Sequence, residues 1–322
     1  MGKGKVQEIV SQRPDLDYST VIFDDELSPS QQRSLESVLD VKVLDRTAVI
    51  LDIFAQHART REGRLQVELA QHEYILPRLR GQWSHLERLE GRIGTRGPGE
   101  TQLETDRRLI RDKISRLKRE IERVRMQRAQ HRRQRAKQGI PVVSLVGYTN
   151  AGKSTLMRAL SGADVLVQNQ LFATLDPVTR RIRLPLGGFA LLTDTVGFIQ
   201  KLPTQLVAAF RATLEELEEA SLLLHVIDIT HPDAEEQAHT VEETLAELGL
   251  KDRPRVTALN KIDVAEGAME DGRWVLKELP AWAKDGVPVS AAKGWGLEEL
   301  RSRIEVALAE TADEQRFAEV GD

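Results

Sequence analysis

The eight residues 147–154 constrain the fold of this chain more than any other segment. They read Gly-Tyr-Thr-Asn-Ala-Gly-Lys-Ser, which fits the pattern G-x-x-x-x-G-K-[ST], and they stand between an apolar run at 142–146 and a helical pattern. In that strand–loop–helix context, successive backbone N–H groups and the helix N-terminus form a cradle for phosphate. The segment therefore predicts an α/β domain built around a phosphate-binding loop.

Further apolar runs follow the loop, and helical stretches separate them. These runs lie at residues 189–192, 222–227, 256–259 and 287–290. The alternation predicts a mainly parallel sheet with helices on both faces. We expect the domain to cover residues 140–312, followed by a short tail at 313–322.

Three short motifs follow the loop in order and indicate which nucleotide it binds. Asp194 leaves an apolar run, where it can hold Mg²⁺ through water, and the Gly197 amide can approach a γ-phosphate closely because glycine has no side chain. Asp263 ends the segment Asn-Lys-Ile-Asp and can accept paired hydrogen bonds from guanine, whereas adenine lacks that donor pair. Ser290-Ala291 would place a backbone amide near the base carbonyl. Together these motifs predict GTP and GDP as ligands and disfavour a helicase-like ATPase.

The motifs assign expected roles to individual residues. Lys153 and Gly197 are the expected catalytic groups, and Ser154, Thr174 and Asp194 are the expected Mg²⁺ ligands. Thr174 is chosen because a threonine in the irregular segment 171–177 could close over the metal; a turn or capping role is the alternative. The expected nucleotide-binding residues are Gly147, Tyr148, Thr149, Asn150, Ala151, Gly152, Lys153, Ser154, Thr155, Phe172, Ala173, Thr174, Asp194, Thr195, Val196, Gly197, Asn260, Lys261, Asp263, Ser290 and Ala291.

Two further residues bear on the expected rate of hydrolysis. Phe198 follows Gly197 and is apolar, so it cannot orient an attacking water as a glutamine would, and slow intrinsic turnover is expected. Asn150 resembles the asparagine that holds a monovalent cation in potassium-stimulated GTPases. This resemblance suggests K⁺ as an activator.

Residues 61–139 have a different apolar period. Apolar residues recur there at spacings of 4 and 3 in two stretches, which predicts two long helices that fold back and bury each other's seams. Pro77 should kink or break the first helix. Residues 91–99 contain four glycines and one proline, so we expect a loop at the tip of this helical hairpin.

Charge is distributed unevenly along the chain. Fourteen basic and six acidic residues lie between positions 100 and 139, although the whole chain carries a net charge of −4. A concentration of this kind suits a polyanionic partner, and a merely solvated helix face is the simpler alternative.

Composition narrows the protein class and the compartment. The chain has no cysteine, which excludes a disulfide scaffold and thiol catalysis and fits a reducing compartment. Its apolar runs are too short to span a membrane, and no secretory signal is visible at its start. We expect a cytoplasmic protein that is monomeric when free and has weak or no membrane association.

Residues 1–60 predict a small α/β subdomain. Strand signals at 20–23 and 41–44 alternate with helices that should begin at Ser28-Pro29 and after Thr47. No catalytic constellation is visible in this part of the chain.

Four segments closely resemble the HflX family of ribosome-associated GTPases. They lie at 23–29, 51–56, 95–108 and 147–155, and the motif Gly-Pro-Gly-Glu-Thr-Gln in the third is specific to this family. Because members usually carry further residues before the position of Met1, the resemblance implies either that the start is misassigned or that the subdomain at 1–60 is incomplete.

The resemblance also implies a partner and a function. It implies binding to the large ribosomal subunit, with the glycine-rich tip near the peptidyl-transferase centre, and splitting or rescue of stalled ribosomes under stress or a role in ribosome biogenesis. The expected rRNA-binding residues, at the tip and on the basic segment beside it, are Arg92, Arg96, Gly97, Pro98, Gly99, Arg107 and Arg108. The alternative is a GTP-regulated docking module for a non-ribosomal acidic protein or a membrane-associated partner.

Overall fold

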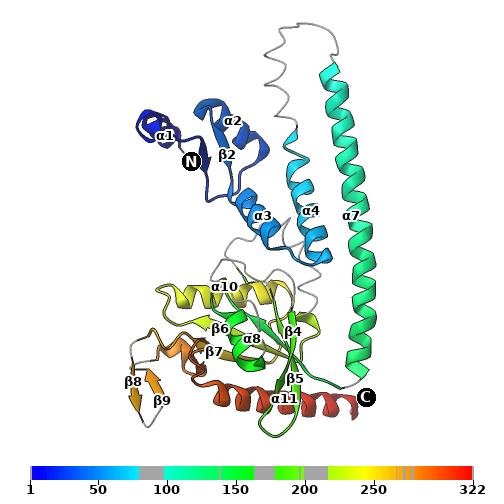
Figure 1. Cartoon of the computed structure of the whole chain (residues 1–322), viewed down its shortest axis with the longest axis vertical. Helices are drawn as coiled ribbons and strands as arrows, with labels where there is room; N and C mark the ends of the chain where they lie inside the picture. The colour runs from blue at the N-terminus through cyan, green and yellow to red at the C-terminus, as the bar shows by residue number, and fades with distance from the viewer. Residues whose placement is uncertain are drawn as a thin grey trace. The chain divides into compact units, whose positions relative to one another are not determined.

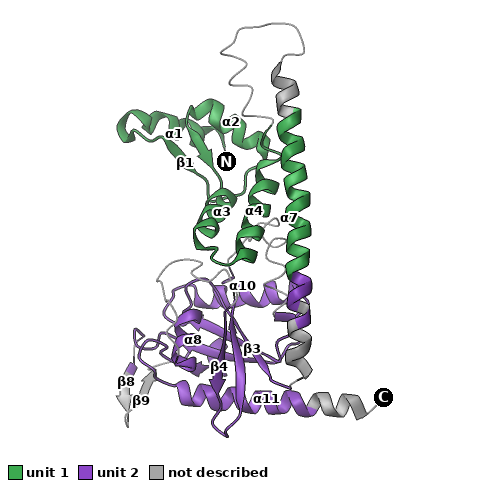
Figure 2. Ribbon diagram, turned by 45° about the vertical axis from the view of Figure 1, so that its right-hand side comes forward, with its two compact units in different colours: residues 1–124, 203–209 green, residues 125–202, 210–322 purple. Residues whose placement is uncertain are grey.

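The structure is a computed structural model, and its elements are labelled in Figure 1. It describes residues 2–79, 98–137, 139–162, 178–195, 197–198, 217–265, 267–270, 273–276 and 279–320. The chain divides into two compact units, coloured in Figure 2. The first comprises residues 1–124 and 203–209, and the second comprises residues 125–202 and 210–322.

The N-terminal part of the first unit has the predicted order of helices and strands. Its elements are α1 (Lys3–Leu16), β1 (Thr20–Ile22), α2 (Pro29–Leu39), β2 (Lys42–Leu44) and α3 (Arg46–His57). Strands β1 and β2 pair in parallel. Helix α2 begins as expected, because the Ser28 hydroxyl accepts from the Gln31 backbone N–H, the Gln31 side chain accepts from the Ser28 N–H, and Pro29 occupies the first turn.

Two longer helices in the first unit bury a shared apolar seam. Helix α4 (Arg61–Ile75) packs against the middle of α7 (Pro98–Lys137), and ion pairs join Glu68 to Lys113 and Arg61 to Glu120. The buried members of the seam are Leu65, Leu69, Ile114 and Leu117. Each helix therefore covers the apolar stripe of the other, as its spacing predicts.

The ends of these helices refine the predicted hairpin. Helix α4 ends at Ile75 and residues 76–78 form a turn, so the expected break at Pro77 is confirmed. Helix α7 begins at Pro98, which corrects the expected loop at 91–99: Pro98 and Gly99 lie in the first helical turn. Proline is compatible with that position because the first N–H groups of a helix have no intrahelical partner. Residues 91–97 lie outside the described residues.

A buried carboxylate links the small subdomain to helix α4. Asp45 is fully buried; its side chain accepts from the backbone N–H groups of Ala48 (2.8 Å) and Leu27 (3.1 Å) and from the Tyr74 hydroxyl (2.8 Å). Arg78 forms an ion pair with it at 3.2 Å and stacks over the Tyr74 ring. This network satisfies a buried charge, as a low-dielectric interior requires.

The second unit contains a six-stranded sheet with the order β10-β7-β6-β3-β5-β4. Its strands are β3 (Val142–Val146), β4 (Val178–Arg183), β5 (Phe189–Asp194), β6 (Leu222–Asp228), β7 (Arg255–Asn260) and β10 (Val287–Pro288). All neighbours pair in parallel except β4, which is antiparallel to β5. The predicted mainly parallel sheet is thus confirmed, whereas β4 and the hairpin of β8 (Gly267–Glu270) and β9 (Arg273–Leu276) were not predicted.

Helices cover both faces of this sheet, as the sequence predicts. Helices α8 (Lys153–Ser161) and α11 (Leu297–Val320) pack on one face, where their apolar residues join Leu224 of β6. Helix α10 (Ala234–Glu247) packs on the other face, against Leu223 of the same strand. The carboxyl ends of the parallel strands meet at one edge, which is where ligands bind in sheets of this kind.

Candidate nucleotide-binding site

The loop between β3 and α8 is shaped by two glycines with positive φ angles. Gly147 has φ +151° and Gly152 has φ +95°. A Cβ atom at Gly147 would overlap the carbonyl oxygen of Val226, and one at Gly152 would overlap the side-chain amide of Asn260. The loop therefore lies directly against β6 and the end of β7, which only residues without a side chain permit.

Gly147→Ala is expected to lower the free energy of unfolding by about 2–5 kcal/mol, because the left-handed backbone region and the overlap with Val226 both oppose a methyl group. Gly187→Ala is the matched control. Gly187 has φ +94° but nothing within 4 Å of an added Cβ, so about 1–2 kcal/mol is expected from the backbone alone. Urea unfolding of both variants measures the difference. Equal losses would contradict the close packing of the loop against β6.

Lys153 occupies the centre of the loop. Its side chain is buried, and Nζ donates to the carbonyl oxygens of Gly147 (3.0 Å) and Tyr148 (2.8 Å). Burial lowers the pKa of Lys153 to about 8, while the nearby Asp194 carboxylate partly opposes this shift. The ammonium is thus held by neutral carbonyl groups, in a position where an anionic ligand would be attracted strongly.

The segment after β5 lies against this loop. A Cβ atom at Gly197 would lie 2.9 Å from Lys153 Nζ and 3.0 Å from Thr149 Cα. The next residue, Phe198, donates its N–H to Gly147 and accepts from the Thr149 N–H, and its ring is buried in the apolar cluster under α10. The backbone at Gly197 therefore faces the lysine, while the Phe198 ring packs in the hydrophobic core.

Hard oxygen atoms converge beside the lysine. The Ser154 hydroxyl donates to Oδ2 of Asp194 at 2.6 Å. Hydroxyl and carboxylate oxygens are the donor types that Mg²⁺ prefers, so this pair fits the metal that the fold implies. Thr195 is turned away from this pair, because its buried hydroxyl donates to the Leu145 carbonyl at 2.6 Å.

The segments that follow β7 and β10 form the second half of the site. The Asn260 amide donates to the Ala151 carbonyl (2.8 Å) and its oxygen accepts from the Ala291 N–H (3.1 Å), so one side chain joins the phosphate loop to the chain after β10. The Ser290 hydroxyl donates to Oδ1 of Asp263 at 2.6 Å. These contacts bring the expected base-binding residues together and fix the orientation of the Asp263 carboxylate.

Sequence reasoning missed Asp228 at the carboxyl end of β6. Its carboxylate forms an ion pair with Lys261 at 2.6 Å, and Lys261 has a positive φ of +69°. Asp228 orders the lysine that lies between the two base-binding residues Asn260 and Asp263. The available signal was an acidic residue at the end of a wholly buried strand.

The remaining predicted residues are distributed as follows. Asn150 is exposed and left-handed, with φ +63°. Arg107 and Arg108 lie on α7 in the first unit, beyond Pro98 and Gly99. The expected site residues that lie outside the described residues are Arg92, Arg96, Gly97, Phe172, Ala173, Thr174 and Val196.

Comparisons with known proteins identify the family. A family model described as 50S ribosome-binding GTPase matches residues 142–261, and models described as GTP-binding GTPase N-terminal and GTP-binding GTPase Middle Region match residues 1–55 and 57–135. The GTPase HflX of Lacrimispora saccharolytica is 51% identical over 308 residues, which cover 96% of this chain and 71% of the relative. The chain belongs to the HflX family of GTPases.

Other HflX relatives and solved structures agree with this assignment. The GTPase HflX of Escherichia coli is 52% identical over 266 residues, which cover 83% of this chain and 62% of that protein. A crystal structure of a GTP-binding protein from Sulfolobus solfataricus in complex with GDP is 29% identical and covers 96% of this chain and 86% of that one, with a TM-score of 0.51. This HflX chain is accordingly a GTP-hydrolysing enzyme of a ribosome-associated family, with a Mg²⁺-dependent nucleotide site.

Proposed function

We propose that this HflX chain is a GTP-driven switch that binds the large ribosomal subunit and splits or rescues stalled ribosomes. The family model that covers the phosphate loop carries the description 50S ribosome-binding GTPase. The observation that carries the proposal is the attachment of a strongly basic helix, α7, to a unit with an assembled candidate nucleotide site. Such a helix suits rRNA phosphates, and hydrolysis would control the docking.

The contacts support a role for each residue of the nucleotide site. Lys153 would neutralise charge on the β- and γ-phosphates, since its ammonium already lies at the centre of the loop. Ser154 and Asp194 would hold Mg²⁺, with Thr174 as the expected third ligand. Asp263 would select guanine, oriented by Ser290.

The basic surface of α7 supports contact with RNA. Several arginines of its described part are exposed, among them Arg108, Arg111, Arg119 and Arg123. Each phosphate neutralised by such a side chain releases counterions, so binding would weaken steeply with salt. Two opposing acidic residues nearby, Glu68 and Glu120, are already occupied by ion pairs within the unit.

Co-sedimentation with purified large ribosomal subunits tests the proposal. We expect the chain to pellet with a non-hydrolysable GTP analogue but not with GDP, and we expect subunits to raise the hydrolysis rate. Arg119→Ala/Arg123→Ala should weaken the association, whereas Arg158→Ala, an exposed arginine of the second unit, should not. Absence of association in both nucleotide states, with hydrolysis unchanged by subunits, would contradict the ribosomal role.

A change in the glycine-rich tip separates this function from its alternative. Replacing Gly97-Pro98-Gly99 should abolish the ribosome effects but spare binding to an acidic protein or to anionic lipid, because charge alone would serve those partners. Among the described residues, no helix combines the length and the apolar character that a membrane span needs. The docking module would be favoured by two results together. The unchanged chain would not bind ribosomal subunits, and both it and the tip variant would bind anionic vesicles.

We also propose K⁺ as an activator. Asn150 is exposed in the middle of the phosphate loop, where its side chain would be accessible to a cation next to bound phosphates. Hydrolysis should be faster in K⁺ than in Na⁺ at equal ionic strength, and Asn150→Ala should remove the difference. Equal rates in the two salts would contradict this role.

A further inference from the structure

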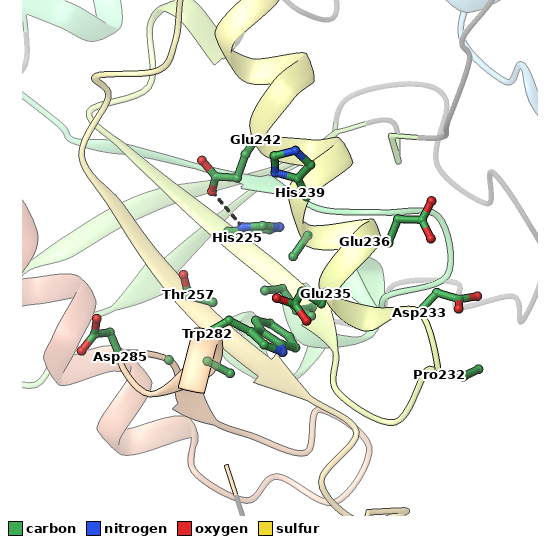
Figure 3. A pocket seen from close by; sticks show the side chains of 14 residues that line it. His225, Pro232, Asp233, Glu235, Glu236, His239, Glu242, Thr257, Trp282 and Asp285 are labelled. Carbon is green, nitrogen blue, oxygen red and sulfur yellow. Dashed lines mark ion pairs between the residues drawn. The ribbon is translucent and has the colours of Figure 1, made fainter. Parts of the chain in front are cut away.

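A second candidate site lies in the unit that holds the nucleotide loop. A cavity of about 780 Å³ lies among β6, α10, β7 and the short helix Ala281–Ala283. It is separate from the described part of the nucleotide site, because none of the expected nucleotide-binding residues that the structure describes lines it. Its volume is within the usual range for ligand pockets. Figure 3 shows its lining side chains.

The lining is strongly acidic. Five acidic residues line the cavity, and among the described residues no lysine or arginine does; the acidic residues are Asp233, Glu235, Glu236, Glu242 and Asp285. Glu242 is paired outside the lining with Arg255, and contacts with His225 and Arg255 lower the pKa of Glu242 to about 2. Glu235 of α10 and Asp285, which follows the short helix, add further negative charge to the lining, and this charge favours a cationic ligand.

A buried histidine supplies the second, independent observation. His225 of β6 is 3% exposed and lines the cavity, with Nδ1 3.6 Å from Oε1 of Glu242. Nε2, on the side of the ring turned away from Glu242 in Figure 3, has no hydrogen-bond partner among the described residues. In the neutral ring with its proton on Nδ1, facing the carboxylate, Nε2 is an acceptor. A buried acceptor without a donor is costly, so a ligand with N–H groups would satisfy it.

An aromatic wall completes the lining. Trp282 is half-buried and faces the cavity together with Glu235 and Asp285, which come from different elements. Indole faces attract cations, most strongly those that are planar and weakly hydrated. The guanidinium group combines this flat shape with five N–H donors in a fixed geometry, whereas an ammonium group is a compact, strongly hydrated charge.

We propose that this cavity binds an arginine side chain of a partner protein. The guanidinium group would stack on Trp282, and its N–H groups would donate to the carboxylates at the rim and to Nε2 of His225. The site would give the nucleotide-binding unit a protein contact that is independent of the basic helix. Because the cavity is acidic and helix α7 is basic, the two surfaces would select partners of opposite charge.

Binding of a short peptide tests the proposal. The probe is an end-capped, glycine-rich peptide whose only charged groups are two arginine side chains, titrated into the full chain with GDP at physiological salt. Its matched control replaces each arginine with citrulline, which keeps the shape and removes the charge. We expect saturable binding of the arginine peptide, at least tenfold weaker binding of the citrulline peptide, and a change in Trp282 fluorescence that is lost in Trp282→Phe.

Two double variants separate the cavity from general charge attraction. Glu235→Gln/Asp285→Asn should weaken peptide binding at least tenfold. Glu299→Gln/Glu310→Gln removes the same charge at two exposed positions of α11 and should leave peptide binding unchanged. Each replacement is isosteric and exposed, so folding should be retained. Equal losses in the two variants, or equal affinity for arginine and citrulline peptides, would overturn the proposal. Displacement of the peptide by spermidine at an equal concentration would instead assign the cavity to a free polyamine and overturn the arginine assignment.

Discussion

Lys153→Ala is expected to reduce kcat/KM for GTP hydrolysis by about 10²–10³-fold. Losses of this size are typical when one preorganised hydrogen-bond donor that stabilises negative charge in the transition state is removed. The variant removes the buried ammonium that lies at the centre of the phosphate loop. The ammonium donates to the loop carbonyls of Gly147 and Tyr148, and the other residues of the loop 147–154 include no basic side chain that could replace its charge. Backbone N–H groups would remain, and they account for the residual activity we expect.

Control measurements separate this catalytic loss from unfolding. Arg158→Ala removes an exposed cation one turn further along α8, and it should hydrolyse GTP like the unchanged chain. Thermal unfolding should show that Lys153→Ala is folded, because it removes a charge whose burial is unfavourable and leaves Gly147 and Tyr148 in place. Hydrolysis by folded Lys153→Ala within twofold of the unchanged chain would show that Lys153 does not stabilise the transition state.

The parts of this fold that the sequence predicts are those encoded by contiguous patterns. The phosphate loop, the parallel strands and the two-helix seam each depend on residues close in sequence, so their spacing alone indicates them. Strand β4 was missed because its Val-Thr-Arg-Arg-Ile-Arg sequence has little apolar alternation, as suits a strand at the sheet edge with exposed arginines. The start of α7 was misplaced because Pro98 and Gly99 favour turns except in the first helical turn.

The contacts that could not be predicted join residues distant in sequence. Asp228 pairs with Lys261 because β6 and β7 are neighbours in register, which no local pattern specifies. Asp45 accepts hydrogen bonds from groups on α3, on α4 and in the segment between β1 and α2, an arrangement that depends on how these elements pack. The acidic cavity likewise draws its lining from four separate elements. Motifs therefore indicate the chemistry of the nucleotide site, while the groups that orient it become visible only in the structure.

Asp263→Asn is expected to weaken GDP binding by about 10²–10³-fold and to create affinity for the xanthine nucleotide XDP. Guanine presents two donors, N1–H and the exocyclic amine, and the Asp263 carboxylate can accept from both. A carboxamide offers one acceptor and one donor, so its NH₂ group would face the guanine amine. Xanthine carries a carbonyl oxygen in place of that amine, so its edge matches the carboxamide.

The contact with Ser290 decides which way the new carboxamide is oriented. The Ser290 hydroxyl donates to Oδ1 of Asp263 at 2.6 Å, so an asparagine there would keep its oxygen toward Ser290 and place its NH₂ group where Oδ2 now lies. Competition of GDP and XDP against a fluorescent nucleotide measures the change. Asp252→Asn is the control and should keep the preference for GDP, because Asp252 is exposed and precedes β7, whereas the motif lies at the opposite end of that strand. Adding Ser290→Ala to Asp263→Asn should reduce the difference in affinity between XDP and GDP, because the carboxamide could then flip. Unchanged GDP affinity in Asp263→Asn would contradict guanine selection by this carboxylate.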